Sequence, residues 1–160
     1  MVSMRYKLSD EMKRFLASKG PRSPFVRIEF RKQLRVIQRE ARKTHDFKSR
    51  QGNLERSIEA KIVNEEPLTG EVFINEAVAP YGTFVHEGTG VYGPKKKPYF
   101  VKPSEKKALR WSKGDKFFFS KGHKVMGQPA DKFLDAAVEK KLDSVSKSLE
   151  AAIYKELSGE

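Results

Sequence analysis

The side chains that could hold a metal ion or move a proton in this sequence are its three histidines, His45, His86 and His123. Zinc sites draw their ligands from His, Cys, Asp and Glu at recurring spacings. None of these histidines has a partner at helical ligand spacing, and His86 and the adjacent Glu87 point to different faces of a helix. The chain has no cysteine, which excludes thiolate ligands and disulfides. A metal site built from the three histidines and Glu87 stays open as an alternative that no spacing motif supports.

The sequence also lacks the patterns that most enzyme classes require. It has no phosphate-cradling glycine loop, no nucleophile elbow and no dinucleotide-binding fingerprint. No pair of carboxylates stands in a context suited to acid–base catalysis. We therefore predict that the protein is not an enzyme and takes no cofactor or metal. A hydrolase with a His/Glu site is kept as the last of three functional classes, after a structural protein and a nucleic-acid-binding protein.

The stretch Tyr81–Gly90, near the middle of the chain, combines a His–Glu pair with closely spaced glycines. Phe84 and Val85 lie three and four residues after Tyr81, a spacing that predicts a shared, buried face of one short helix. Pro80 precedes this helix at a position where its missing N–H has no cost. The following glycines can adopt a positive φ, so we expect the helix to end there.

A basic loop follows the Glu87–Gly90 corner, where the predicted helix ends. Residues 91–103 are rich in proline and lysine and are not expected to form regular structure for long. We predict that the corner and the loop are exposed docking elements, together with a basic extension at 122–127. The candidate interface residues are Glu87, Gly88, Thr89, Gly90, Lys95, Lys96, Lys97 and His123.

Charge is distributed unevenly along the 160 residues, whose formal net charge is +12. Residues 1–50 hold 15 Lys and Arg against 5 Asp and Glu, and residues 94–132 hold 12 against 3. Residues 51–93 reverse the sign, with 2 basic residues against 7 acidic ones. Such asymmetry favours contact with an acidic partner or with another copy of the chain. No run of about 20 apolar residues suggests a membrane span, and we expect a soluble, intracellular protein.

Helices are predicted at both ends of the chain. Residues 8–18 form a short helix, and a longer one starts at Pro24 with Ser23 as its N-cap. Its apolar stripe is Phe30, Leu34, Ile37 and Ala41, and its other face is basic. From about residue 130 a long helix carries a second stripe: Leu134, Val138, Leu142, Val145, Leu149, Ile153 and Leu157. At about 1.5 Å per residue this helix is longer than a domain of this size needs to cover its own core, so its end is expected to project or to pack on a neighbour.

Two antiparallel hairpins are predicted between the helices. The first pairs residues 58–63 with 71–75 through a turn at 64–70, and the second pairs 108–111 with 116–120. Trp111 and the phenylalanines of the second hairpin are predicted to cover the core, although a platform for stacking bases has the same pattern. The expected fold is α+β in a single domain over 1–160, with an N-terminal helical extension at 1–22. Exposed loops are expected at about 91–105 and 120–130.

Short motifs in this order resemble the tail-completion, or head–tail joining, proteins of long-tailed bacteriophages. That family has a Gly-x-Leu-x-x-Ser-Ile stretch before its first strand, a tyrosine-led short helix ending in Glu-Gly-Thr, an inserted hairpin and a Gly-His segment. In this chain they correspond to Gly52-Asn53-Leu54-Glu55-Arg56-Ser57-Ile58, Tyr81, Val85-His86-Glu87-Gly88-Thr89-Gly90, Lys106-Lys107-Ala108-Leu109-Arg110-Trp111 and Gly122-His123-Lys124.

The resemblance covers about residues 24–140 and implies a structural virion protein at the neck or top of the tail, a minor tail protein in broad terms. Its implied partners are a head connector, a tail terminator or tail tube, and further copies of itself in a ring. DNA would pass nearby without sequence-specific binding, and no membrane is involved. The implied location is the virion, and the host cytoplasm during assembly. The alternative is a basic nucleic-acid-binding protein that uses the basic helix face and the Lys-rich loop.

Overall fold

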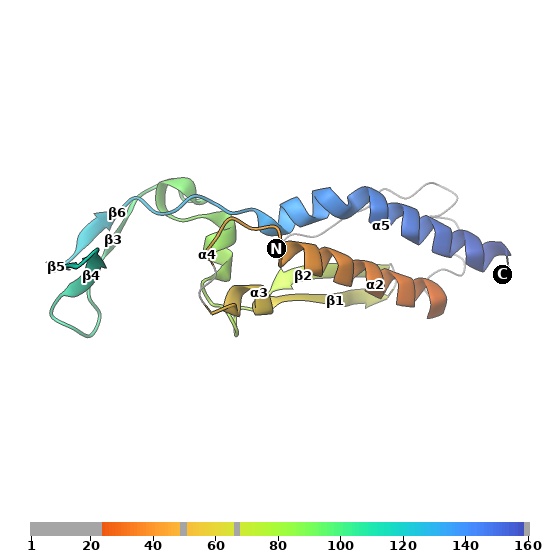
Figure 1. Cartoon of the computed structure of the whole chain (residues 1–160), viewed down its shortest axis with the longest axis horizontal. Helices are drawn as coiled ribbons and strands as arrows, with labels where there is room; N and C mark the ends of the chain where they lie inside the picture. Colours follow the sequence, from red (N-terminus) through yellow and green to blue (C-terminus); the bar gives the residue numbers. More distant parts are fainter. Residues whose placement is uncertain (1–23, 49–50, 66–67, 159–160) are drawn as a thin grey trace. The chain divides into compact units, whose positions relative to one another are not determined.

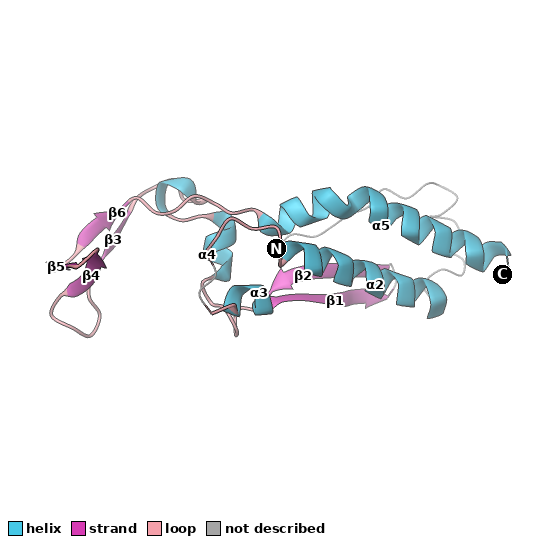
Figure 2. Ribbon diagram, viewed as in Figure 1, coloured by secondary structure: helices cyan, strands magenta, loops and turns pink. Residues whose placement is uncertain are grey.

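The computed structural model describes residues 24–48, 51–65 and 68–158, and its fold is α+β (Figures 1 and 2). The predicted helix over 8–18 lies outside these residues. The elements are, in order, α2 (Pro24–Ala41), α3 (Asn53–Ser57), β1 (Ile58–Glu65), β2 (Leu68–Ile74), α4 (Gly82–Glu87), η2 (Gly90–Tyr92), β3 (Tyr99–Val101), β4 (Leu109–Lys113), β5 (Lys116–Ser120), β6 (His123–Val125) and α5 (Phe133–Ser158).

The chain divides into two compact units. Unit 1 takes in the described residues up to Gly82 and from Lys132 onward, and unit 2 is Thr83–Asp131. Each unit is described by itself below. Whether they fold as the single domain expected from the sequence stays a prediction. No helix of the described residues is long and apolar enough to cross a membrane.

Unit 1 is built around α2, whose start at Pro24 and end at Ala41 confirm the prediction. Proline suits the first helical position because its ring presets φ and no N–H is lost. The residues that α2 buries fall on one stripe: Val26, Leu34, Ile37 and Ala41. Figure 1 shows α2 beside α5 and beside the hairpin of β1 and β2, with which it is in contact.

The first hairpin is antiparallel, with Ile58 opposite Ile74 and Ala60 opposite Val72. Gly70 belongs to the same face, and a Cβ there would lie 2.9 Å from Phe30 Cε1 and closer still to Leu34, so β2 approaches α2 closely. The strands extend further than predicted, because the expected turn at 64–70 includes paired residues at both of its ends. The sequence also gave no indication of α3, which begins after Gly52 at a φ of 69°.

The long C-terminal helix is confirmed as α5, a helix of 26 residues. It runs antiparallel to α2, since Val26 packs with Ile153 at one end while Glu40 bonds to Lys140 and Lys141 at the other. Glu40 Oε1 lies 2.5 Å from Lys140 Nζ, and Glu40 Oε2 lies 3.3 Å from Lys141 Nζ. The bond from Lys140 first, then the one from the Thr44 hydroxyl and then the one from Lys141 lower the pKa of Glu40 from 4.5 to about 2.

The predicted buried face of α4 is wrong. Tyr81 is 48% exposed and Phe84 is 61% exposed, while His86 is buried. Gly82 explains this orientation, because a Cβ on it would lie 2.8 Å from Leu54 Cδ1 and closer still to Ile74. His86 follows four residues later and shares the Gly82 face of the helix. A six-residue helix is too short for its side-chain pattern to decide which face is covered.

We predict that Gly70→Ala destabilises unit 1, because the added methyl group overlaps Leu34 in a packed interior. The free energy of unfolding should fall by about 1–3 kcal/mol in urea titration. Val63→Ala is the control, since Val63 is exposed at an irregular position of β1 and its truncation should change little. A Gly70→Ala variant as stable as the wild type would mean that β2 does not approach α2 this closely.

The Glu40 carboxylate predicts a pH dependence of stability. Because its pKa is lowered in the folded protein, its contribution is present above pH 4.5 and is lost as the pH falls from 4.5 toward about 2. In Glu40→Gln this loss should be absent, so urea midpoints should fall less steeply across that range. Glu139→Gln, an exposed carboxylate on α5, controls for the removal of one charge. Parallel profiles for wild type and Glu40→Gln would contradict the assignment.

Candidate interaction surface

Unit 2 consists of an outgoing segment that runs to the β4–β5 hairpin, the hairpin itself, and a returning segment that lies beside the outgoing one (Figure 1). β3 of the outgoing segment pairs with β6 of the returning one, with Tyr99 opposite Val125 and Val101 opposite His123. β4 and β5 form a separate two-stranded hairpin between them in sequence. The pairing of β4 with β5 confirms the second predicted hairpin.

The Glu87–Gly90 corner joins the two segments instead of facing solvent. The Thr89 N–H donates to the Gln128 carbonyl at 3.0 Å, and the Gln128 N–H donates to Thr89 Oγ1 at 3.0 Å. The Val91 N–H donates to the Met126 carbonyl at 2.8 Å. Gly88 is buried, and Glu87 and Thr89 are half-buried. The expectation of an exposed corner is therefore corrected, because backbone pairing covers it.

Glycine is required at this crossing for two reasons. Gly88 and Gly90 have φ angles of 76° and 63°, as the sequence predicted for the end of the helix. A Cβ on Gly90 would also lie 2.6 Å from the Met126 carbonyl carbon, and one on Gly127 would lie 2.7 Å from Gly90 Cα. The backbones touch where any side chain would separate them.

The basic loop is exposed as predicted. Lys95, Lys96 and Lys97 are all exposed, between η2 and β3. The Lys96 N–H donates to the Gly93 carbonyl at 3.0 Å, which closes a turn, and Lys96 adopts a φ of 47°. This is the region of backbone space that favours glycine, so the turn holds a lysine in a conformation of higher energy.

The aromatic residues of the second hairpin do not cover a core, and that prediction is wrong. Trp111 and Phe118 are opposite each other, and Phe119 is opposite Arg110. Trp111 is 42% exposed and Phe119 is 68% exposed. Successive residues of a strand point to opposite faces, so both faces of this two-stranded ribbon carry uncovered rings. The sequence pattern shows the alternation but cannot show how little of the hairpin is covered by other elements.

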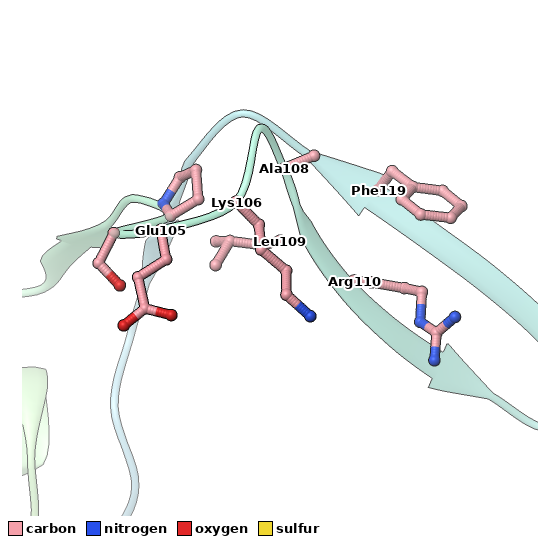
Figure 3. Close-up of a pocket in the computed structure, with 8 residues that line it drawn as sticks. Glu105, Lys106, Ala108, Leu109, Arg110 and Phe119 are labelled. Carbon is pink, nitrogen blue, oxygen red and sulfur yellow. The ribbon is translucent and has the colours of Figure 1, made fainter.

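A hollow of about 750 Å³ lies at the start of this hairpin (Figure 3). Its walls combine charge with apolar surface. They are formed by Pro103, Ser104, Glu105, Lys106, Ala108, Leu109, Arg110 and Phe119. Figure 3 shows that all of these side chains come from β4, β5 and the segment that leads into β4. The hollow is open, with the Glu105 carboxylate among cations, and it shows no arrangement suited to catalysis.

The three histidines are not brought into a metal site. His123 lies on β6 with its ring 5.0 Å from that of Trp111, whereas His45 pairs with Glu55 at 3.6 Å in unit 1. Among the residues that the structure describes, no group of three or more His, Asp or Glu could hold a metal ion. His123 Nδ1 is buried and has no hydrogen-bond partner within the described chain.

The cations of unit 2 form no ion pairs within the described chain. Residues 83–131 hold 11 Lys and Arg against 4 Asp and Glu. Two of these cations lie over aromatic rings instead: Arg110 Cζ is 4.8 Å from the Phe117 ring centroid, and Lys102 Nζ is 5.9 Å from that of Phe100.

Two carboxylates from the acidic middle of the sequence, in contrast, form ion pairs inside unit 1. Glu65 pairs with Arg27, and Glu71 Oε1 lies 2.9 Å from Lys61 Nζ. Two members of the predicted basic face of α2 are engaged within unit 1, since Arg27 forms the ion pair with Glu65 and Arg42 Nη2 donates to the Ile58 carbonyl at 2.7 Å. The surfaces of opposite charge that we expected from runs of like charge in the sequence are therefore weaker than the residue counts suggest.

No protein-family model, curated protein or solved structure matches this chain. The resemblance to phage tail-completion proteins therefore stays a prediction from short motifs. The surface described above has to carry any functional argument by its own physical properties.

We predict that Gly90→Ala opens the crossing at the base of unit 2. The matched control is Gly114→Ala, because Gly114 has a similar φ of 62° and a Cβ there would meet nothing within 4 Å. Both variants place a Cβ on a residue with a positive φ, which raises the free energy of the folded state by about 1–2 kcal/mol. Only Gly90→Ala adds a backbone clash. Hydrogen exchange at the Val91 amide should accelerate in Gly90→Ala and not in Gly114→Ala. Equal exchange rates in the two variants would show that the close approach is unimportant.

Proposed function

We propose that this protein is a structural virion protein that joins or completes the tail of a long-tailed bacteriophage at the head–tail interface, and that unit 2 is its docking element. The observation that carries the proposal is the β4–β5 hairpin, whose rings are uncovered on both faces. The ordered set of motifs in the sequence supplies the biological setting. Neither support depends on the other.

A two-stranded hairpin is marginally stable in water unless something packs against it. Exposed apolar patches mark interaction sites in folded proteins. Besides Trp111, the exposed rings of unit 2 include Phe84, Tyr92, Tyr99, Phe100, Phe117, Phe118 and Phe119. Assembly would remove this surface from water and hold the hairpin in place, which is the behaviour expected of a part that functions within a larger particle.

The charges of unit 2 indicate what kind of surface such a partner has. Because the cations of unit 2 form no ion pairs within the described chain, they are available to an acidic surface, which we assign to another protein of the neck or tail. A head connector, a tail terminator or the tail tube are the candidates. A ring of copies around the DNA path remains part of the proposal, with contacts that do not rest on the acidic middle of the sequence.

The proposal predicts that charge reversal in the basic loop weakens assembly. Lys95→Glu, Lys96→Glu and Lys97→Glu together should lower the yield of completed particles when purified protein is added to a lysate that lacks it. The physical reason is the loss of exposed cations that face an acidic partner. Particle yield is counted by electron microscopy or by infectivity.

Arg31→Glu, Arg35→Glu and Arg39→Glu on α2 make a matched control with the same change in net charge. This triple variant should complete particles at nearly the wild-type level if α2 does not dock. Unchanged yield with the Lys95–Lys97 variant would count against the docking loop. Wild-type protein that never enters particles would refute the head–tail role itself.

A further inference from the structure

One face of the β4–β5 hairpin has the geometry of a small stacking platform. Trp111 and Phe118 are directly opposite each other, with ring centroids 5.8 Å apart and ring planes inclined by only 17°. Both side chains keep about two-fifths of their surface exposed, at 42% and 41%. The His123 ring of β6 lies 5.0 Å from that of Trp111 and covers part of it. The exposed remainder of two near-parallel rings can accept further planar groups by stacking.

Two lysines stand beside this platform on the same face. Lys113 is opposite Lys116 at the end of the hairpin, two residues from Trp111 and Phe118 respectively. Like charges directly opposite each other across a strand pair are destabilising. Asp115 lies in the turn between the two lysines, but neither lysine forms an ion pair with it or with any other residue of the described chain. An anion bound between them would relieve the repulsion, so the site favours a ligand with planar groups and negative charge.

The opposite face of the ribbon is less suited to the same ligand. There Arg110 already lies over the Phe117 ring, with Cζ 4.8 Å from the centroid. The Glu105 carboxylate borders the neighbouring hollow and would repel an anion (Figure 3). The two faces therefore differ in chemistry, although both expose aromatic rings.

We propose that the Trp111–Phe118 face binds single-stranded nucleic acid. Bases stack on the two rings, and the phosphates that connect them meet Lys113 and Lys116. Exposed aromatic rings beside unpaired cations are the combination that non-specific single-strand binding uses. Paired bases in a duplex are already stacked on one another, so the rings favour a single strand. This inference does not depend on the head–tail role, and it places nucleic acid away from the basic face of α2.

The sequence contains one tryptophan, so Trp111 reports on its own site. Titration of the full chain with oligo(dT) of roughly 20 nucleotides, longer than typical single-strand sites, should quench the tryptophan emission. A duplex of the same length should quench it far less. Affinity should fall with salt, because bound cations release counterions from the phosphates.

Three variants separate stacking, charge and fold, with affinity read from the anisotropy of a labelled oligo(dT). Phe118→Leu keeps the apolar bulk but removes a ring, and should weaken binding by about 5-fold or more. Lys113→Gln with Lys116→Gln should reduce the slope of log affinity against log salt by about 1.4, or 0.7 for each phosphate contact. Phe119→Leu, on the opposite face of the same strand, should bind like the wild type.

Several results would overturn the proposal. One is oligo(dT) that leaves the Trp111 emission unchanged, and another is an affinity that depends on Phe119 as much as on Phe118. Loss of binding in Arg31→Gln with Arg35→Gln would move the site to α2. Emission that responds to phosphatidylserine–phosphatidylcholine vesicles and not to oligo(dT) would make this face a lipid-contact surface instead.

Discussion

The close approach of two backbone segments at the base of unit 2 is the constraint on which the rest of that unit depends. Gly90 and Gly127 let the outgoing and returning chains touch, and the Val91–Met126 and Thr89–Gln128 hydrogen bonds fix their register. The register of β3 with β6 continues from this crossing, and β4 and β5 lie between those strands in sequence. Since backbone atoms make the contact, no pattern of side-chain hydrophobicity records it.

The two units differ in how much of their apolar and charged surface is covered. Unit 1 buries the apolar stripes of α2 and α5 against each other and the inner face of the first hairpin against α2, and it pairs several of its carboxylates locally. Unit 2 has strands that pair only two at a time, and its rings and cations remain exposed. A chain that keeps such a surface uncovered is best explained by a partner that covers it. The physical properties of the surface argue for docking, whereas the identity of the particle rests on motif order.

The parts that the sequence predicted correctly are those with a strong periodic pattern. α2, α5 and both hairpins follow from spacing alone, and the exposed lysines at 95–97 follow from composition. The failures have a common cause, because burial depends on what packs against an element. Tyr81 and Phe84 were expected inside, but the packing of Gly82 turns them outward. Trp111 was expected to cover a core, but it stays 42% exposed, and its described ring neighbours are Phe118 across the hairpin and His123 of β6.

The most direct test compares hydrogen exchange of the free protein with that of the protein within assembled particles. We predict that backbone amides of residues 109–120 exchange rapidly in the free chain, because a two-stranded ribbon opens readily. In the particle the same amides should be protected, while those of α2 should exchange slowly in both states. A hairpin that is fully protected in the free chain, or one that assembly leaves unchanged, would contradict the claim that a partner completes unit 2.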